Sequence, residues 1–277
     1  MLLAALSLPP LSSPAPPLHE LLSSPCAHVH LSTHTLGRLS PSRRPLDALR
    51  SAVGLTLALR LSRCGVRIGH DAGGRPRVEA AGGEPLLCED VSIAHHGSWV
   101  MAAAAVAARV GVDVLRVDSV PVTVRERAHL AAYLAPSECA VLEALVGASA
   151  PYHARAFAAL WALKEACAKA LGSEGMSAHS FSELALGPPC LAALMAWAPA
   201  GEGPLEVTLA PHPSGSAWRA RAWMMDAEHV AAAALLVGGE GGEALLLWPP
   251  AALQVVTLEE LVACGKQGER LSERRAC

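Results

Sequence analysis

The longest uninterrupted stretch of helix-favouring residues constrains the fold of this chain most. It runs from Tyr152 to Leu171, contains neither Gly nor Pro, and is rich in Ala and Leu, which favour helices. Its apolar residues gather on one side of a helix. Gly172 follows directly, in the position where glycine commonly ends a helix. The sequence therefore predicts one long helix over residues 152–171.

Segments with strand-like patterns lie on both sides of this helix in the sequence. Residues 111–117 alternate apolar and polar side chains, as a half-buried strand does. Further strand candidates are residues 91–94, 100–106, 205–209, 218–223 and 229–236, the last two separated by a turn at Asp226-Ala227.

Two further helices are expected over residues 45–60 and 122–146, and a loop with several Gly and Pro residues over 66–85. The order helix, loop, strand pair then occurs twice. It predicts an α+β fold of two similar lobes, each a small antiparallel sheet packed on a long helix, related by a pseudo-two-fold axis.

The expected domains are a leader over residues 1–40, an N-terminal lobe over 41–108, a C-terminal lobe over 109–262 and a charged tail over 263–277. The leader is rich in Leu, Ser and Pro, with Glu20 as its one acidic residue and no Lys or Arg before Arg38. We expect a cytoplasmic protein, with a plastid or mitochondrion as the alternative if the leader is a transit segment. The missing arginines weaken the mitochondrial alternative.

Composition excludes several classes of protein. Of the 277 residues 52% are hydrophobic, but no apolar run reaches the roughly 18 residues of a spanning helix, so we expect a soluble protein without a membrane partner. The net charge of −3 argues against a nucleic-acid partner. The eight cysteines form no CxxC pair, which fits buried thiols in a reducing compartment.

The long helix carries the strongest set of polar residues, in the segment WALKEACAKALG over residues 161–172. Trp161, Glu165 and Lys169 are spaced four apart and share one face of the helix. A carboxylate there can hold a hard cation, and the neighbouring amine can bind a phosphate or handle a proton. Taken alone, Glu165 and Lys169 also fit an ordinary surface ion pair of about 0.3–0.5 kcal/mol.

Three other short segments carry candidate residues. Asp113 lies on a predicted strand among apolar residues, where a charge needs a partner or a metal unless it faces solvent. His95 and His96 end another predicted strand and either contact a phosphate or bind backbone groups. Arg75 lies in a Gly-Gly-Arg-Pro turn, a pattern that is equally typical of an exposed loop arginine.

The order and spacing of these four segments resemble the 4′-phosphopantetheinyl transferases. That family shows a GKP-like turn, an N-x-S-H strand end, a G-[IV]-D strand and a W-x-x-K-E-[AS]-x-x-K-x-x-G helix. Here the segments read GRP (74–76), SIAH (92–95), GVD (111–113) and WALKEACAKALG (161–172). The helix motif is the most specific of the four. The resemblance covers roughly residues 45–262 and is closest to the two-lobed monomeric class of the aminoadipate-semialdehyde-dehydrogenase type.

The resemblance implies a role for each matching residue. Asp113 and Glu165 match the Mg²⁺-binding carboxylates, and Lys169 matches the lysine beside the reacting phosphate. Lys164 matches a lysine near the phosphates of coenzyme A. Glu165 or Lys169 would remove the proton from the attacking serine.

The remaining implied contacts are to the 3′-phosphate end of coenzyme A. His95 matches the histidine that contacts this phosphate, and Arg75 stands where the GKP lysine would. Ser92 and Ala94 depart from the family's Asn and Ser, and Leu115 stands where bacterial members often carry a third carboxylate. Two protein carboxylates, with waters and phosphate oxygens, still suffice for Mg²⁺.

The implied reaction transfers 4′-phosphopantetheine from coenzyme A to a serine of an apo-acyl carrier protein, or of a carrier domain in a multidomain synthase, by a monomeric enzyme. The products are holo-carrier and adenosine 3′,5′-bisphosphate. Two alternatives stay open. One is a non-catalytic relative that binds a carrier protein or coenzyme A. The other is an unrelated Ala-rich interaction protein in which residues 161–172 form a surface helix.

Overall fold

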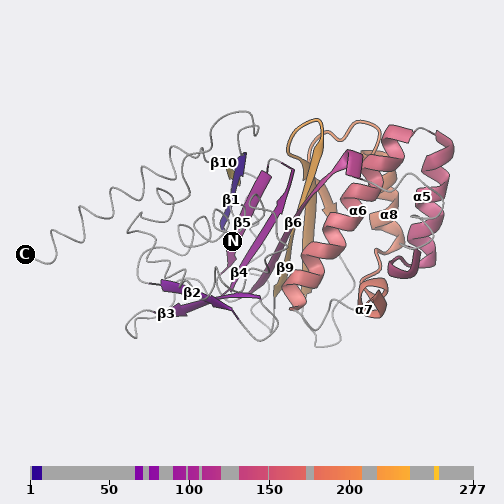
Figure 1. Cartoon of the computed structure of the whole chain (residues 1–277). Helices are drawn as coiled ribbons and strands as arrows, with labels where there is room; N and C mark the ends of the chain where they lie inside the picture. Colours follow the sequence, from indigo (N-terminus) through magenta and orange to yellow (C-terminus); the bar gives the residue numbers. More distant parts are fainter. Residues whose placement is uncertain are drawn as a thin grey trace, which may run out of the picture. The chain divides into compact units, whose positions relative to one another are not determined.

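The chain folds into an α+β structure with two sheets and several helices, as the sequence predicts (Figure 1). The computed structural model divides it into two compact units. The first is Met1–Asp71 with Pro76–Val106 and Pro249–Cys277, and the second is Ala72–Arg75 with Ala107–Trp248. The residues described are 2–7, 66–70, 75–80, 90–97, 99–105, 108–119, 131–148, 150–172, 178–207, 217–237 and 253–255.

The first unit contains a six-stranded sheet in the order β10-β1-β5-β4-β3-β2. Neighbouring strands are antiparallel, except that β1 and β10 run parallel. The predicted strands at residues 91–94 and 100–106 are confirmed as β4 and β5, and β5 is buried along its whole length. The strands are β1 (Leu2–Ser7), β2 (Val66–His70), β3 (Pro76–Ala80), β4 (Asp90–His96), β5 (Trp99–Ala105) and β10 (Leu253–Val255).

Two features of this sheet differ from the expected pattern. The predicted loop over residues 66–85 contains the β2–β3 hairpin, in which Val66 pairs with Ala80 and His70 with Pro76. Pro76 begins β3, because Gly and Pro residues mark hairpin connections as often as longer loops. In addition, residues 2–7 of the expected leader form β1, which pairs with β5 and β10.

The helix expected over residues 45–60 lies outside the described residues, as do the rest of the leader and the tail. The predicted likeness between the two lobes therefore stays a prediction. None of the helices among the described residues is both long and apolar enough to span a membrane.

The second unit is a four-stranded antiparallel sheet with helices packed against it. The sheet order is β6-β9-β8-β7, which confirms the strands predicted in the last third of the chain. β9 is buried at every position. The strands are β6 (Arg109–Arg116), β7 (Leu205–Val207), β8 (Ala217–Met224) and β9 (His229–Val237).

The predicted long helix is confirmed as α6 (Ala150–Leu171). Pro151 lies in its first turn, where the missing N–H of proline has no helical partner to lose. Gly172 ends the helix with φ of 102°, and its N–H donates to Ala168 O at 3.0 Å. The helix packs along β6, β9 and β8, and Figure 1 shows it lying lengthwise against that sheet.

Helices α5 and α8 pack on α6 and on each other, and α8 also packs against β7. Of the helix predicted over residues 122–146, the part from Pro136 onward is helical as α5, and Pro136 disfavours helical backbone at the residue before it. A short 3₁₀ turn, η2, precedes α5, and residues 122–130 lie outside the described residues. The helices are η1 (Val117–Ser119), η2 (Ala131–Tyr133), α5 (Pro136–Ala148), α7 (Ala178–Glu183) and α8 (Pro188–Trp197).

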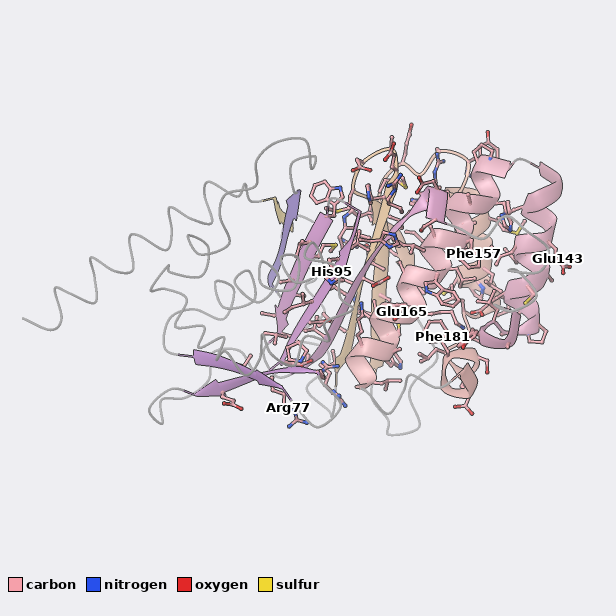
Figure 2. The ribbon with its side chains drawn as sticks, viewed as in Figure 1. Arg77, His95, Glu143, Phe157, Glu165 and Phe181 are labelled. Atoms are coloured by element: carbon pink, nitrogen blue, oxygen red, sulfur yellow. The ribbon has the colours of Figure 1, made fainter. Side chains whose placement is uncertain are left out.

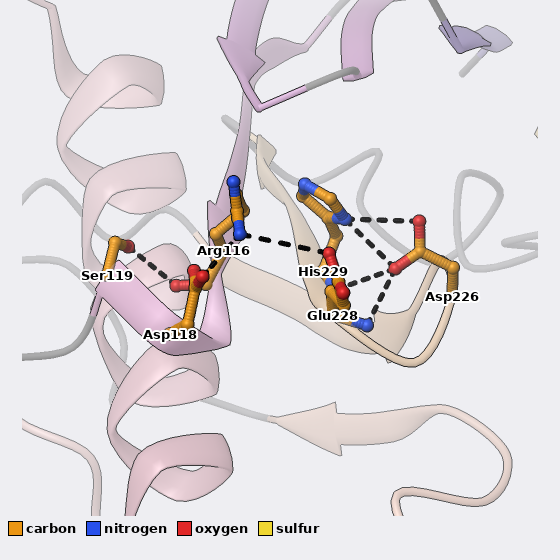
Figure 3. Close-up of polar contacts among 6 residues, drawn as sticks. All are labelled: Arg116, Asp118, Ser119, Asp226, Glu228 and His229. Atoms are coloured by element: carbon orange, nitrogen blue, oxygen red, sulfur yellow. Dashed lines mark hydrogen bonds and ion pairs between the residues drawn. The ribbon is translucent and has the colours of Figure 1, made fainter. Parts of the chain in front are cut away.

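Polar contacts tie the end of β6 to the turn between β8 and β9 (Figure 3). The Arg116 guanidinium contacts Asp118 and lies 3.9 Å from the Glu228 carboxylate. The carboxylate of Asp226 accepts the backbone N–H of His229 at 2.8 Å and contacts its Nδ1 at 2.9 Å. These contacts confirm the turn predicted at Asp226-Ala227.

Candidate active site

The site is built where strand β6 approaches helix α6 most closely. A Cβ atom at Gly111 would lie 1.8 Å from the carbonyl oxygen of Ala166 and 2.7 Å from the backbone nitrogen of Ala170. Only glycine permits this approach. Since side chains alternate along a strand, Asp113 lies on the same face of β6 as Gly111 and is brought to α6 by it.

Asp113 forms an ion pair with Lys169 of α6. The Lys169 Nζ lies 2.6 Å from the Asp113 Oδ1 and donates a second hydrogen bond to the carbonyl of Val112 at 3.1 Å. The Asp113 side chain is 13% exposed and that of Lys169 is 28% exposed, so water still reaches both groups. Two residues 56 positions apart in the sequence thus meet.

Glu165 completes the set one helical turn before Lys169. Burial raises the pKa of its carboxyl, and the negative charge of Asp113 raises it further. The Lys169 charge and a hydrogen bond from Trp161 act in the opposite direction. Two carboxylates and one ammonium therefore share this region, and one negative charge is in excess when all three are ionised.

This donor set fits a hard cation that brings part of its own coordination shell. Within the described ranges there is no group of three or more His, Cys, Asp and Glu side chains placed to hold a metal. Leu115, which follows Asp113 on the same face of β6, adds no oxygen ligand. Mg²⁺ commonly uses only one or two protein carboxylates and completes its shell with water and substrate phosphates. Asp113 and Glu165 fit that mode of binding.

Lys164 is not brought to this group, although it is the sequence neighbour of Glu165. Its side chain is 1% exposed, and its Nζ lies 2.9 Å and 3.2 Å from the two carboxylate oxygens of Glu138. It also donates to the carbonyl of Leu184 at 3.2 Å. Adjacent residues of a helix point about 100° apart, which places the two side chains in different surroundings. In this structure Lys164 belongs to a buried ion pair.

Glu138 is the residue that the sequence reasoning missed. Its carboxylate accepts the backbone N–H groups of Ala135 at 2.8 Å and Leu186 at 2.9 Å in addition to the ammonium of Lys164. Glu138 is the third residue of α5, and Pro136 is the first, so the start of this helix carries half of a capping box. That signal could have located the helix start, but not the partner on α6.

The two residues expected at the 3′-phosphate of coenzyme A lie in different units. Arg75 belongs to the second unit, where its Nη2 donates to the carbonyl of Val110 on β6 at 3.1 Å. His95 lies on β4 of the first unit, is half-buried and pairs with Val100 of β5 (Figure 2). Ala94, where the family has serine, is buried on the opposite face of the strand from His95.

Comparison with known protein families gives a match that lies within the second unit. Residues 109–234 match the family model described as the 4′-phosphopantetheinyl transferase superfamily. The matched range includes β6, α5, α6 and most of the second sheet, and it contains Asp113, Glu165 and Lys169. No curated protein matches the chain significantly. The match supports a phosphopantetheinyl transferase domain over these residues.

Proposed function

We propose that this protein transfers the 4′-phosphopantetheine group of coenzyme A to a serine of an apo-acyl carrier protein or carrier domain, in the presence of Mg²⁺. The observation that carries the proposal is the ion pair of Asp113 on β6 with Lys169 on α6, with Glu165 one helical turn before Lys169, inside the range matched to the superfamily. The sequence motifs favour the two-lobed monomeric class of the aminoadipate-semialdehyde-dehydrogenase type.

The two carboxylates would hold the cation. When bound, Mg²⁺ supplies positive charge that neutralises the pyrophosphate of coenzyme A. Without it, Glu165 and Asp113 repel each other, and this repulsion adds to the effect of burial in raising the pKa of Glu165. A cation shared with the substrate phosphates relieves the repulsion, so metal and substrate are expected to bind together.

Lys169 and Glu165 would divide the proton and phosphate roles. The Lys169 ammonium, which pairs with Asp113, would donate to a phosphate oxygen. Glu165, or alternatively Lys169, would accept the proton of the carrier serine. The serine oxygen forms a bond to the β-phosphorus, and the bond between that phosphorus and the bridging oxygen breaks. The products are holo-carrier and adenosine 3′,5′-bisphosphate.

Arg75 and His95 are proposed to bind the 3′-phosphate of coenzyme A. Both side chains can donate hydrogen bonds to phosphate. Arg75→Ala should then raise the KM for coenzyme A and reduce the discrimination against dephospho-coenzyme A. If neither quantity changes, this assignment is wrong.

The function is tested by incubating the full chain with apo-acyl carrier protein, coenzyme A and Mg²⁺. We expect the carrier mass to increase by one phosphopantetheine group, with one adenosine 3′,5′-bisphosphate released for each carrier modified. A carrier with its acceptor serine changed to alanine is the control. Binding of the carrier or of coenzyme A with no gain in mass would contradict transfer and favour the non-catalytic alternative.

A further inference from the structure

Lys169 is held at two points on strand β6. Its ammonium donates to the Asp113 Oδ1 at 2.6 Å and to the backbone carbonyl of Val112 at 3.1 Å. An ammonium has three N–H donors, so two of them are used by neighbouring residues of one strand. A lysine on a helix usually keeps its ammonium in water, but here the side chains of Lys169 and Asp113 are only 28% and 13% exposed. Lys169 therefore gives the Asp113 carboxylate a fixed positive neighbour.

The hydrogen bond to Val112 follows from the register of the sheet. At the end of the β6–β9 ladder the N–H of Val117 donates to the carbonyl of Glu228. Hydrogen-bonded pairs alternate along an antiparallel ladder, so Asp113 directs its backbone groups to β9 and Val112 directs its own to the opposite edge of β6. The carbonyl at that edge holds the Lys169 ammonium without involving the Asp113 carboxylate. The ammonium can therefore stay on β6 when this carboxylate takes another partner.

The ion pair opposes a divalent cation at Asp113. The Lys169 ammonium neutralises the charge of this carboxylate and would lie next to any cation bound by it. Glu165, one helical turn before Lys169, leaves the group with one unmatched negative charge. Like charges a few ångströms apart repel each other strongly where water is partly excluded. The attraction of the two carboxylates for a cation is thus reduced by a positive charge that belongs to the protein.

Coenzyme A would reverse this balance. Its pyrophosphate brings negative charge, and an ammonium donates readily to phosphate oxygens. Lys169 can turn a donor from Asp113 to a phosphate oxygen and keep its hydrogen bond to Val112. The Asp113 carboxylate then becomes available to a cation shared with the phosphates, which is how Mg²⁺ is commonly held when a site has few protein carboxylates.

We propose that Lys169 sets the order of binding, because it pairs with Asp113 in the free protein and admits a divalent cation only together with coenzyme A. The inference rests on the proposed function and adds to it a role for Lys169 before the reaction begins. Cation and coenzyme A then bind with positive coupling, and Lys169 increases this coupling. By linkage, the factor by which coenzyme A tightens cation binding equals the factor by which the cation tightens coenzyme A binding.

The test measures Mn²⁺ binding to the full chain by calorimetry, with and without saturating coenzyme A, in the wild type and in Lys169→Met. Without coenzyme A we expect Lys169→Met to bind Mn²⁺ about 10-fold more tightly, because the opposing ammonium is gone. With coenzyme A this gain should disappear, because the variant also lacks the donor to phosphate. The coupling factor should then be about 10-fold smaller in the variant than in the wild type.

Three further variants keep the test specific. Lys169→Arg retains the positive charge and should bind Mn²⁺ alone as weakly as the wild type. Arg221→Met removes a positive charge from the ion pair of Arg221 with Glu206 on β8 and β7, and should leave Mn²⁺ binding unchanged. If Lys169→Met does not fold, as judged by its Tm, Lys169→Gln replaces it, because the amide removes the charge and keeps a donor for the Val112 carbonyl.

The outcomes separate the inference from the proposed function. The inference is wrong if Lys169→Met binds Mn²⁺ alone no more tightly than the wild type does. It is also wrong if coenzyme A tightens Mn²⁺ binding by the same factor in both proteins. Either result leaves transfer by the wild type untouched. If the wild type with coenzyme A neither binds Mn²⁺ nor modifies the carrier, the proposed function fails, and the inference fails with it.

Discussion

Helix α6 carries two lysine–carboxylate pairs five residues apart, and their surroundings differ. The pair of Lys164 with Glu138 is buried, with side chains 1% and 0% exposed. The pair of Lys169 with Asp113 is partly open to solvent, at 28% and 13%. In the first pair each charge is matched, and backbone groups use the remaining hydrogen-bonding capacity of both partners.

The open pair has a third member, and this decides its chemistry. Glu165 adds a second carboxylate next to Asp113, so a single ammonium cannot neutralise the group. A buried, matched pair fixes the fold and has no capacity for a ligand. A partly exposed pair with an unmatched carboxylate can accept a cation and exchange ligands. The comparison teaches that burial and charge balance, more than residue type, separate a structural pair from a candidate catalytic one.

The largest expected effect is on stability, from breaking the buried pair. Glu138→Ala leaves the Lys164 ammonium and two backbone N–H groups buried without their acceptor. We expect it to lower the free energy of unfolding by about 3–5 kcal/mol. Asp113→Ala, its counterpart in the open pair, should change it by less than about 1 kcal/mol. Urea unfolding followed by circular dichroism measures both. Equal losses of unfolding free energy in the two variants would contradict the distinction between a structural pair and an open pair.

A double-mutant cycle sharpens the same comparison. The double variant Glu138→Gln/Lys164→Met removes both charges together. Its loss of unfolding free energy should therefore be smaller than the sum of the losses in the two single variants. We expect a coupling energy of about 1–3 kcal/mol for the buried pair. Asp113→Asn with Lys169→Met should give less than about 1 kcal/mol. A larger coupling in the open pair would contradict the account.

Replacing Glu165 is expected to have a smaller effect on stability, and this effect should be an increase. Its pKa is raised in the folded protein, first by burial and then by Asp113, above the ordinary value of 4.5. Ionised Glu165 therefore opposes folding once the pH rises above its ordinary pKa, and fully so above the folded pKa. Without metal, Glu165→Gln should raise the Tm by roughly 1–3 °C at neutral pH. The gain should vanish below about pH 4.5, where both states are protonated. A lower Tm at neutral pH would contradict the shift.

The sequence predicted the helix that carries the candidate residues better than the contacts around it. Residues 152–171 lack helix breakers, so α6 and its end at Gly172 followed from local chemistry. The spacing of Glu165 and Lys169 on one helix face also fits an ordinary surface ion pair, so it was the resemblance to the family's motifs that grouped these two residues with Asp113. Their meeting depends on a close approach of strand and helix, which a glycine permits and spacing alone does not reveal.

The buried pair could not be predicted in the same way. Glu138 and Lys164 are 26 positions apart and meet only because α5 packs on α6. Nothing in the segment WALKEACAKALG shows that its first lysine points into the core while its second reaches Asp113. The resemblance alone placed both lysines near phosphates, because motifs record residue types and not burial.

The central claim, that Asp113 and Glu165 hold one divalent cation together, is tested most directly by counting bound Mn²⁺. Electron paramagnetic resonance titrations would use the wild type, Asp113→Ala and Glu165→Ala, each with coenzyme A. We predict one Mn²⁺ for each wild-type chain, and loss of that binding and of transfer in either variant, with the fold retained. Full Mn²⁺ binding and full transfer in either carboxylate variant would contradict the account.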